Sequence, residues 1–228
     1  MLCVQIGGTQ MEKLDYKKQY RELYQPKSVP AVVNVPEMKF IAVNGRGNPN
    51  DPNGEYQKAI ETLYALSYAI KMMPKSGNTP PDYFEYVVPP LEGLWWLEGK
   101  EAFDYSSKSQ FCWTALIRQP EFVTDVLFAA ACEITAKKKP HIELSAARLM
   151  TLTEGLCVQC MHQGSFDDEP ATLAKMDAFI AENSLQNDLS NTRRHHEIYL
   201  SDPRKVEISK IKTVLRIPVQ EKESEVNA

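Results

Sequence analysis

A short segment near the carboxyl end of the chain places an acidic residue among imidazole and aromatic side chains. The segment Arg193–Pro203 (RRHHEIYLSDP) is predicted to form a strand that runs into a turn. Because side chains alternate across a strand, His195, Glu197 and Tyr199 share one face, while Ile198 lies on the other and faces the core. A lone glutamate on a strand is most often solvated. Glu197 therefore becomes a functional candidate only if the rest of the chain forms a cleft around it.

A second acidic residue lies beside tryptophans earlier in the chain. Glu92 comes three residues before the pair Trp95 and Trp96 in the run LEGLWW, and the third tryptophan is Trp113. A carboxylate against tryptophan faces in a cleft of low dielectric favours a delocalised lipophilic cation. The alternative is that Trp95 belongs to the core and Trp96 to the surface, or the reverse.

The placement of both acids depends on an internal duplication. Residues 38–119 are predicted to form strand, helix, strand and strand, and residues 148–219 repeat this order after a connecting helix at residues 120–136. Each first strand ends in glycine before a turn, and each last strand carries Thr-x-Leu and then a proline. We interpret the chain as two copies of one βαββ unit. A pseudo-twofold axis would then bring Glu197 and a counterpart, either Glu92 or Glu85, to the seam between the copies.

The helix of the first copy, predicted over residues 55–73, carries an apolar stripe at helical spacing. Tyr64 and Tyr68 lie on or beside this stripe. They form either a core-facing edge or part of a ligand wall, and we keep them as candidate ligand-binding residues.

The segments outside the two copies are expected to contribute less. Residues 1–37 are predicted to be an N-terminal arm and a proline-containing linker, residues 38–219 a single domain, and residues 220–228 a disordered tail. Met11 resembles a more natural beginning than Met1, so we expect residues 1–10 to be an extension.

Composition and charge exclude several classes of function. The net charge is −4 and the pI about 5.7, which gives no electrostatic footprint for nucleic acid. We expect a cytoplasmic protein, because no apolar run is long enough for a membrane helix and no signal peptide is present.

The five cysteines are interpreted as free thiols. Cys157 and Cys160 would point to opposite faces of a strand, so we predict no metal site and no cofactor, and a dyad of Cys160 with His162 lacks an orienting group. His195 and His196 are expected to be a solvated pair.

Three segments resemble the GyrI-like small-molecule-binding proteins. They are residues 38–54, the run PLEGLWW and above all the run HHEIYLSDP, and residues 11–27 resemble the start of the stand-alone members. The likeness covers roughly residues 11–219. It implies an α+β fold in which a duplicated βαββ unit, with pseudo-twofold symmetry, forms an antiparallel sheet with helices on one face and a central ligand cleft.

The resemblance also implies function. In the effector domains of multidrug-responsive transcription regulators, an acidic residue in this cleft meets lipophilic cations, and Glu197 matches that position. Our first hypothesis is therefore a binding and detoxifying protein for bulky hydrophobic or cationic aromatic compounds, with ligand-binding residues Trp95, Trp96, Trp113, Tyr64, Tyr68, Glu197 and Tyr199.

Some stand-alone relatives hydrolyse cyclopropane-bearing DNA-alkylating natural products. The alternative hypothesis is such a hydrolase, in which Glu197 is the general base, Glu92 a possible partner and Tyr199 a stabilising donor. A protein-interaction factor that inhibits gyrase is a second alternative, although nothing in the sequence indicates a protein partner, a membrane or nucleic acid.

Overall fold

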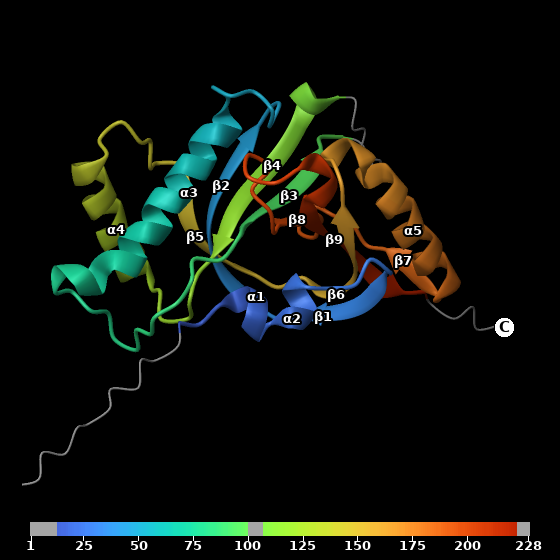
Figure 1. The fold of residues 1–228 in the computed structure, drawn as a ribbon, viewed down its shortest axis with the longest axis horizontal. Coiled ribbons are helices and arrows are strands. Elements are labelled where there is room, and N and C mark those ends of the chain that lie inside the picture. The colour runs from blue at the N-terminus through green and yellow to red at the C-terminus, as the bar shows by residue number, and fades with distance from the viewer. Residues whose placement is uncertain (1–12, 100–106, 223–228) are drawn as a thin grey trace, which may run out of the picture.

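The structure, a computed structural model, describes residues 13–99 and 107–222. The predicted extension at residues 1–10 lies outside these ranges. The described chain forms one nine-stranded sheet with five α-helices, and all of its strand pairs are antiparallel (Figure 1). The strands are β1 (Ala31–Val35), β2 (Met38–Arg46), β3 (Leu91–Leu97), β4 (Phe111–Arg118), β5 (Ala147–Leu152), β6 (Gly155–Gln163), β7 (Leu185–Asn187), β8 (His195–Tyr199) and β9 (Lys212–Glu221). The helices are α1 (Tyr16–Gln19), α2 (Arg21–Tyr24), α3 (Glu55–Met72), α4 (Asp125–Lys138) and α5 (Glu169–Glu182).

The sheet has the same strand order on both sides of its centre. Its order is β1-β6-β9-β8-β3-β4-β2-β5, and β7 pairs with β9. Strands β8 and β3 meet at the centre, and each is followed outward by the last and then the first strand of its own unit. This order supports the predicted duplication. The two edge strands are exchanged, because β1 pairs with β6 and β5 pairs with β2, so residues 148–152 extend the first unit and not the second.

The helices α3 and α5 cover the two halves of one sheet face. Helix α3 packs on β2 and β4, while α5 packs on β6, and α4 lies against α3 (Figure 1). The apolar stripe of α3 explains this packing, since Leu63, Leu66 and Ile70 are fully buried. The prediction of a helix over residues 55–73 is confirmed to within one residue.

The N-terminal arm is part of the core. Tyr16, Leu23 and Tyr24 are buried against the face of the sheet opposite α3 and α5. The linker after it contains β1, which completes the sheet edge beside β6. The arm therefore covers a surface that would otherwise expose residues such as Phe40 and Val214 to water.

Several element boundaries differ from those predicted. Strand β9 extends through Glu221 because β7 pairs with its end, so the predicted tail begins too early. Helix α4 begins after Thr124, whose side chain accepts a hydrogen bond from the Leu127 amide, and not near Pro120.

The cysteine expectations are confirmed within the described residues. Cys112, Cys132, Cys157 and Cys160 are free thiols. On β6, Cys157 and Cys160 belong to hydrophobic clusters on opposite sheet faces. No helix in the described part of the chain is long and apolar enough to cross a membrane.

Candidate functional site

The pairing of β3 with β8 decides which acid shares a face with Glu197. Gly93 lies opposite Glu197, and Glu92 lies opposite Ile198. Because directly opposed residues point to the same face, Glu92 and Glu197 point to opposite faces of the sheet. The prediction that Glu92 lies beside Glu197 is therefore wrong. It fails by one residue of strand register, and a shift of one residue moves a side chain to the opposite face of the sheet.

Glu197 is held by its neighbours on β8 and β3. Its side chain is buried, and the Tyr199 hydroxyl donates a hydrogen bond of 2.8 Å to its Oε2. The Trp95 indole N–H in turn donates to the Tyr199 oxygen at 2.8 Å. On the other side, His195 Nε2 lies 3.3 Å from Glu197 Oε1. Both carboxylate oxygens therefore have a polar neighbour, and the group is fixed in orientation.

Two glycines make room for the rings around this chain of hydrogen bonds. A Cβ atom at Gly93 would lie 2.6 Å from Trp95 Nε1 and 2.9 Å from the Tyr199 hydroxyl oxygen. A Cβ atom at Gly45 would lie 2.1 Å from the ring of Trp113. Real Cβ atoms do not approach so closely, so glycine at these two positions leaves the space that the Trp95, Tyr199 and Trp113 side chains occupy.

Aromatic side chains pack together on the sheet face that carries Glu197. Tyr56, in the first turn of α3, packs 5.0 Å from Trp113 and 5.2 Å from Trp95 between ring centroids. Phe166, just before α5, meets the Tyr199 ring edge-on at 5.8 Å. The site therefore combines a buried carboxylate with large apolar rings, as the sequence predicts for a ligand that is flat and hydrophobic.

A second carboxylate, Glu169, lies on the same side of the sheet and was not predicted. It is the first residue of α5 and is 1% exposed, and its Oε1 has no hydrogen-bond partner among the residues that the structure describes. Burial, and then the charge of Glu197, raise the pKa of Glu169 well above its ordinary value. The protonated form of Glu169 is therefore favoured more than that of an ordinary glutamate. In the sequence it ends a polar run, Ser165 to Glu169, that is typical of a turn.

The hydroxyl of Tyr199 also stays protonated. Burial and the neighbouring charge of Glu197 raise its pKa well above the ordinary value. The hydroxyl is therefore available as a donor, and in this structure its proton is directed at Glu197.

The opposite face of β8 carries a buried ionic network. His196 Nδ1 lies 2.9 Å from Glu154 Oε1, and His196 Nε2 lies 2.9 Å from Glu92 Oε2. Arg216 donates to Glu154 Oε2 at 2.7 Å, and the Tyr24 hydroxyl donates to Glu92 Oε1 at 3.3 Å. The prediction of a solvated histidine pair is wrong, because His196 is fully buried here and His195 is 6% exposed beside Glu197. The prediction that their rings lie on opposite faces is confirmed.

Charges in this network shift the pKa values of its members. Burial alone would lower the pKa of His196, but Glu154 and then Glu92 raise it to about 9. Burial alone would raise the pKa of Glu154, but His196 and Arg216 lower it to about 2. Glu154 and His196 are therefore both charged at neutral pH. Glu92 contacts His196 in this network and does not belong to the site around Glu197.

The remaining predicted residues lie elsewhere. Trp96 points to the opposite face from Trp95, and the Arg194 guanidinium lies 4.6 Å above its ring. Glu85 lies in the loop before β3, where its nearest cation is Lys13 at 3.9 Å. Neither residue is placed next to Glu197.

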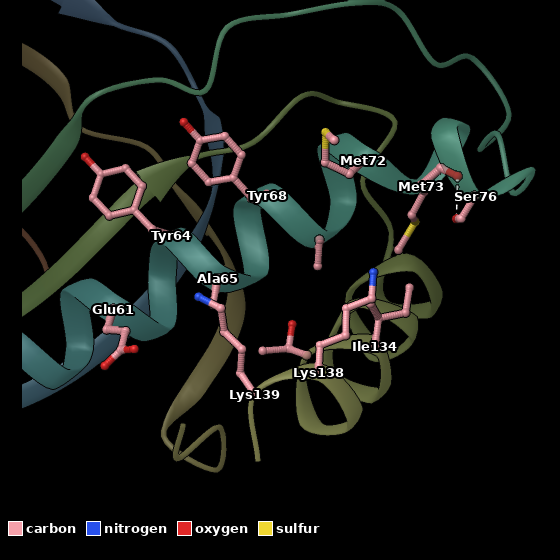
Figure 2. A pocket seen from close by; sticks show the side chains of 12 residues that line it. Glu61, Tyr64, Ala65, Tyr68, Met72, Met73, Ser76, Ile134, Lys138 and Lys139 are labelled. Carbon is pink, nitrogen blue, oxygen red and sulfur yellow. Dashed lines mark hydrogen bonds between the residues drawn. The ribbon is translucent and has the colours of Figure 1, made fainter. Parts of the chain in front are cut away.

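Tyr64 and Tyr68 line a groove between α3 and α4. Their rings stack at 6.4 Å between centroids, and the groove has a volume of about 460 Å³ (Figure 2). Glu197, Tyr199 and the three tryptophans are not among the residues that line it. Within residues 13–99 and 107–222, no group of three or more His, Cys, Asp or Glu side chains is arranged to hold a metal ion.

Comparison with known proteins identifies the family. The model of the GyrI-like small molecule binding domain matches residues 29–220, so the chain belongs to the GyrI-like family. A conserved protein of Listeria innocua that is described as uncharacterized is 46% identical, with a TM-score of 0.87 over 91% of this chain and 100% of that one. A protein from Listeria innocua that is described as a hydrolase is 44% identical, with a TM-score of 0.83 over 91% of this chain and 100% of that one.

More distant similarity concerns the fold alone. The EcmrR C-terminal domain is 10% identical, with a TM-score of 0.51 over 84% of this chain and 97% of that one. No curated protein matches the chain. The resemblance predicted from the segments HHEIYLSDP and PLEGLWW is thus confirmed, as is an α+β fold built on one antiparallel sheet.

Proposed function

We propose that this protein is a hydrolase that adds water to a strained, electrophilic ring, such as a cyclopropane, in a flat hydrophobic compound. The observation that carries the proposal is the pair of buried carboxyl groups, Glu197 and Glu169, on the sheet face that also carries a cluster of aromatic rings. The description of a 44% identical relative as a hydrolase supports a hydrolytic reaction.

Glu197 is the proposed general base. The hydrogen bond from Tyr199 and the close approach of His195 hold its two oxygens in one orientation. A water molecule that gives a proton to this carboxylate becomes a better nucleophile toward the ring carbon. A positioned base of this kind contributes about 10²- to 10⁴-fold to a rate.

Glu169 is the proposed general acid, and it replaces Glu92 as the second carboxyl group of the site. In a cyclopropane conjugated with a ketone, attack by water forms a C–O bond and breaks a ring C–C bond. The electron pair of that C–C bond moves through the conjugated system to the ketone oxygen, which must then gain a proton. The raised pKa of Glu169 favours its protonated form, and its Oε1 has no hydrogen-bond partner among the described residues, whereas the proton of Tyr199 is already directed at Glu197. Transfer of the proton from Glu197 back to Glu169, through solvent, completes the cycle.

The rings around Glu197 favour a substrate that is apolar and planar. Trp95, Trp113 and Tyr56 pack against one another in a buried aromatic cluster. In the proposed complex the aromatic system of the substrate lies beside this cluster, which keeps water away from the electrophile except at the attacking position. Trp96, Tyr64 and Tyr68 are no longer part of the proposed wall, because they lie elsewhere in the fold.

The test is turnover of a conjugated cyclopropyl ketone, followed by mass spectrometry in isotopically labelled water. We expect one labelled oxygen in the product, and a rate lowered by about 10²-fold or more in Glu197→Gln. Glu182→Gln is the matched control, because Glu182 is an exposed carboxylate at the other end of α5. Product formation that is unchanged in Glu197→Gln would remove the base from the mechanism.

Capture of a lipophilic cation without turnover is the second candidate function. It is favoured by one observation, a carboxylate buried against aromatic rings, which attracts delocalised cations. Tryptophan fluorescence with a lipophilic cation and its neutral isostere distinguishes the two functions. Preference for the cation, lost in Glu197→Gln and without any hydrated product from the cyclopropyl ketone, would favour binding over hydrolysis.

A further inference from the structure

The groove between α3 and α4 has the features of a second ligand site. Its cavity of about 460 Å³ lies within the range of small-molecule pockets, about 300–1,000 Å³. Figure 2 shows Tyr64, Tyr68 and Met72 along α3, and Ile134, Lys138 and Lys139 on or just after α4. The groove does not include any residue of β3, β8 or α5. It is therefore separate from the site around Glu197.

One wall of the groove is aromatic and exposed. The rings of Tyr64 and Tyr68 stack with an interplanar angle of 29°, and Tyr68 and Met72 are 50% and 40% exposed. A patch of large apolar side chains that is exposed to water is unfavourable, and such patches often mark the binding site of a ligand or partner. The methionine thioether can adapt to a ligand surface and contacts aromatic rings favourably.

A buried polar atom lies in the same groove. Thr135 lines it and is only 3% exposed, yet its Oγ1 has no hydrogen-bond partner within the described ranges. A buried hydroxyl without a partner costs free energy, roughly 1–3 kcal/mol in general. A ligand oxygen in the groove would satisfy it.

The rim of the groove is positively charged. Lys138 and Lys139 lie at the carboxyl end of α4, and in the described part of the chain no carboxylate lies within 4.0 Å of either ammonium group. Glu61, which also lines the groove, has His141 Nε2 at 3.3 Å. The two free ammonium groups therefore attract an anion to this rim.

From this arrangement we propose that the α3–α4 groove binds flat aromatic carboxylates. The aromatic system of the ligand lies against Tyr64, Tyr68 and Met72, and its carboxylate accepts from the Thr135 hydroxyl and pairs with Lys138 and Lys139. The proposal does not depend on the function assigned to Glu197.

The test uses three naphthalene derivatives that differ in charge: naphthalene-2-carboxylate, the neutral carboxamide, and the naphthylmethyl ammonium ion. Isothermal titration with the full chain should show binding in the order carboxylate, amide, ammonium. We expect the double variant Lys138→Gln/Lys139→Gln to weaken carboxylate binding about ten-fold, at low salt, and to bind the amide normally. Thr135→Val, which keeps the shape of the side chain, should weaken the carboxylate by about ten-fold.

Two controls locate the site. Lys137→Gln removes a neighbouring exposed charge that does not line the groove, and it should leave the affinity within about two-fold. Glu197→Gln should also bind naphthalene-2-carboxylate normally. Equal affinity for the acid and the amide, or equal loss in Lys137→Gln and in the double variant, would overturn the proposal, as would loss of binding in Glu197→Gln.

Discussion

The buried ionic network on the His196 face of β8 predicts a large loss of stability when Glu154 is replaced by glutamine. Glu154 accepts from His196 and from Arg216, and all three side chains are at most 5% exposed. Glutamine keeps the volume of the side chain but removes the negative charge between two buried cations. Breaking a buried ion pair from one side costs roughly 3–5 kcal/mol, because the remaining charge is left without a partner.

The pKa shifts of Glu154 and His196 give a similar loss of unfolding free energy, and they determine how that free energy depends on pH. Folding lowers the pKa of Glu154 from 4.5 to about 2, which corresponds to about 3 kcal/mol. This stability is present above pH 4.5 and is lost as the pH falls toward 2. Folding raises the pKa of His196 from 6.5 to about 9, which is again about 3 kcal/mol. That contribution is present below pH 6.5 and is lost as the pH rises toward 9, because the folded protein then holds a proton that the unfolded chain releases. Both values describe largely the same interaction and are not added.

Urea unfolding at a series of pH values measures both effects. At pH 6 we expect Glu154→Gln to lower the free energy of unfolding by about 3 kcal/mol, and to flatten the fall in stability between pH 6.5 and 9, with Glu92 retaining part of it. Glu61→Gln is the matched control, since Glu61 faces a histidine at 3.3 Å on the exposed surface, and it should change stability by less than about 1 kcal/mol. The reasoning is refuted if Glu154→Gln and Glu61→Gln have equal stability and equal pH profiles.

Three further changes test the site itself. Gly93→Ala should destabilise the fold by about 1–3 kcal/mol and change the near-UV circular dichroism, because the new methyl group overlaps the Trp95 indole. Glu169→Gln should lower turnover by about 10²-fold or more, and leave the protein at least as stable at pH 7 in urea unfolding, because the raised pKa already costs the folded state at that pH. Tyr199→Phe leaves the Trp95 N–H without its acceptor, so it should cost about 1–3 kcal/mol in unfolding and also slow turnover. Stability and turnover that both stay at wild-type values in Tyr199→Phe would mean that this hydroxyl does not position Glu197.

The face on which Glu197 lies could be predicted from β8 alone. Alternation separates His195, Glu197 and Tyr199 from His196 and Ile198, and the structure has this separation. The helix α3 and most of the strands could also be predicted, because their signals are local: an apolar stripe in the helix and glycines or prolines at the ends of the strands. The strands β1 and β7 were missed, and β5 was assigned to the wrong unit.

The partner of Glu197 could not be predicted, because it depends on register between strands about one hundred residues apart. Comparing the run Leu91-Glu92-Gly93 with the run His196-Glu197-Ile198 equates Glu92 with Glu197, but the pairing of β3 with β8 places Gly93 opposite Glu197. A sequence comparison that is wrong by one residue still looks similar. In a sheet, however, a shift of one residue places the carboxylate on the opposite face. Glu169 was missed for a different reason: the helix start that carries it is brought over β8 only by the packing of α5.

The two faces of β8 carry different buried groups, and the ionic network on one face bears on the proposed site on the other. On one face, the proposed mechanism requires Glu197 and Glu169 each to be held in position relative to the substrate. On the other face, His196 is held between Glu154 and Glu92, in contacts of 2.9 Å on both sides. Since His196 and Glu197 are adjacent on one strand, the ionic network also fixes the backbone that carries the proposed base. The strand β8, which has only five residues (His195–Tyr199), is thus held in place in part by charged groups on the face opposite the proposed substrate site.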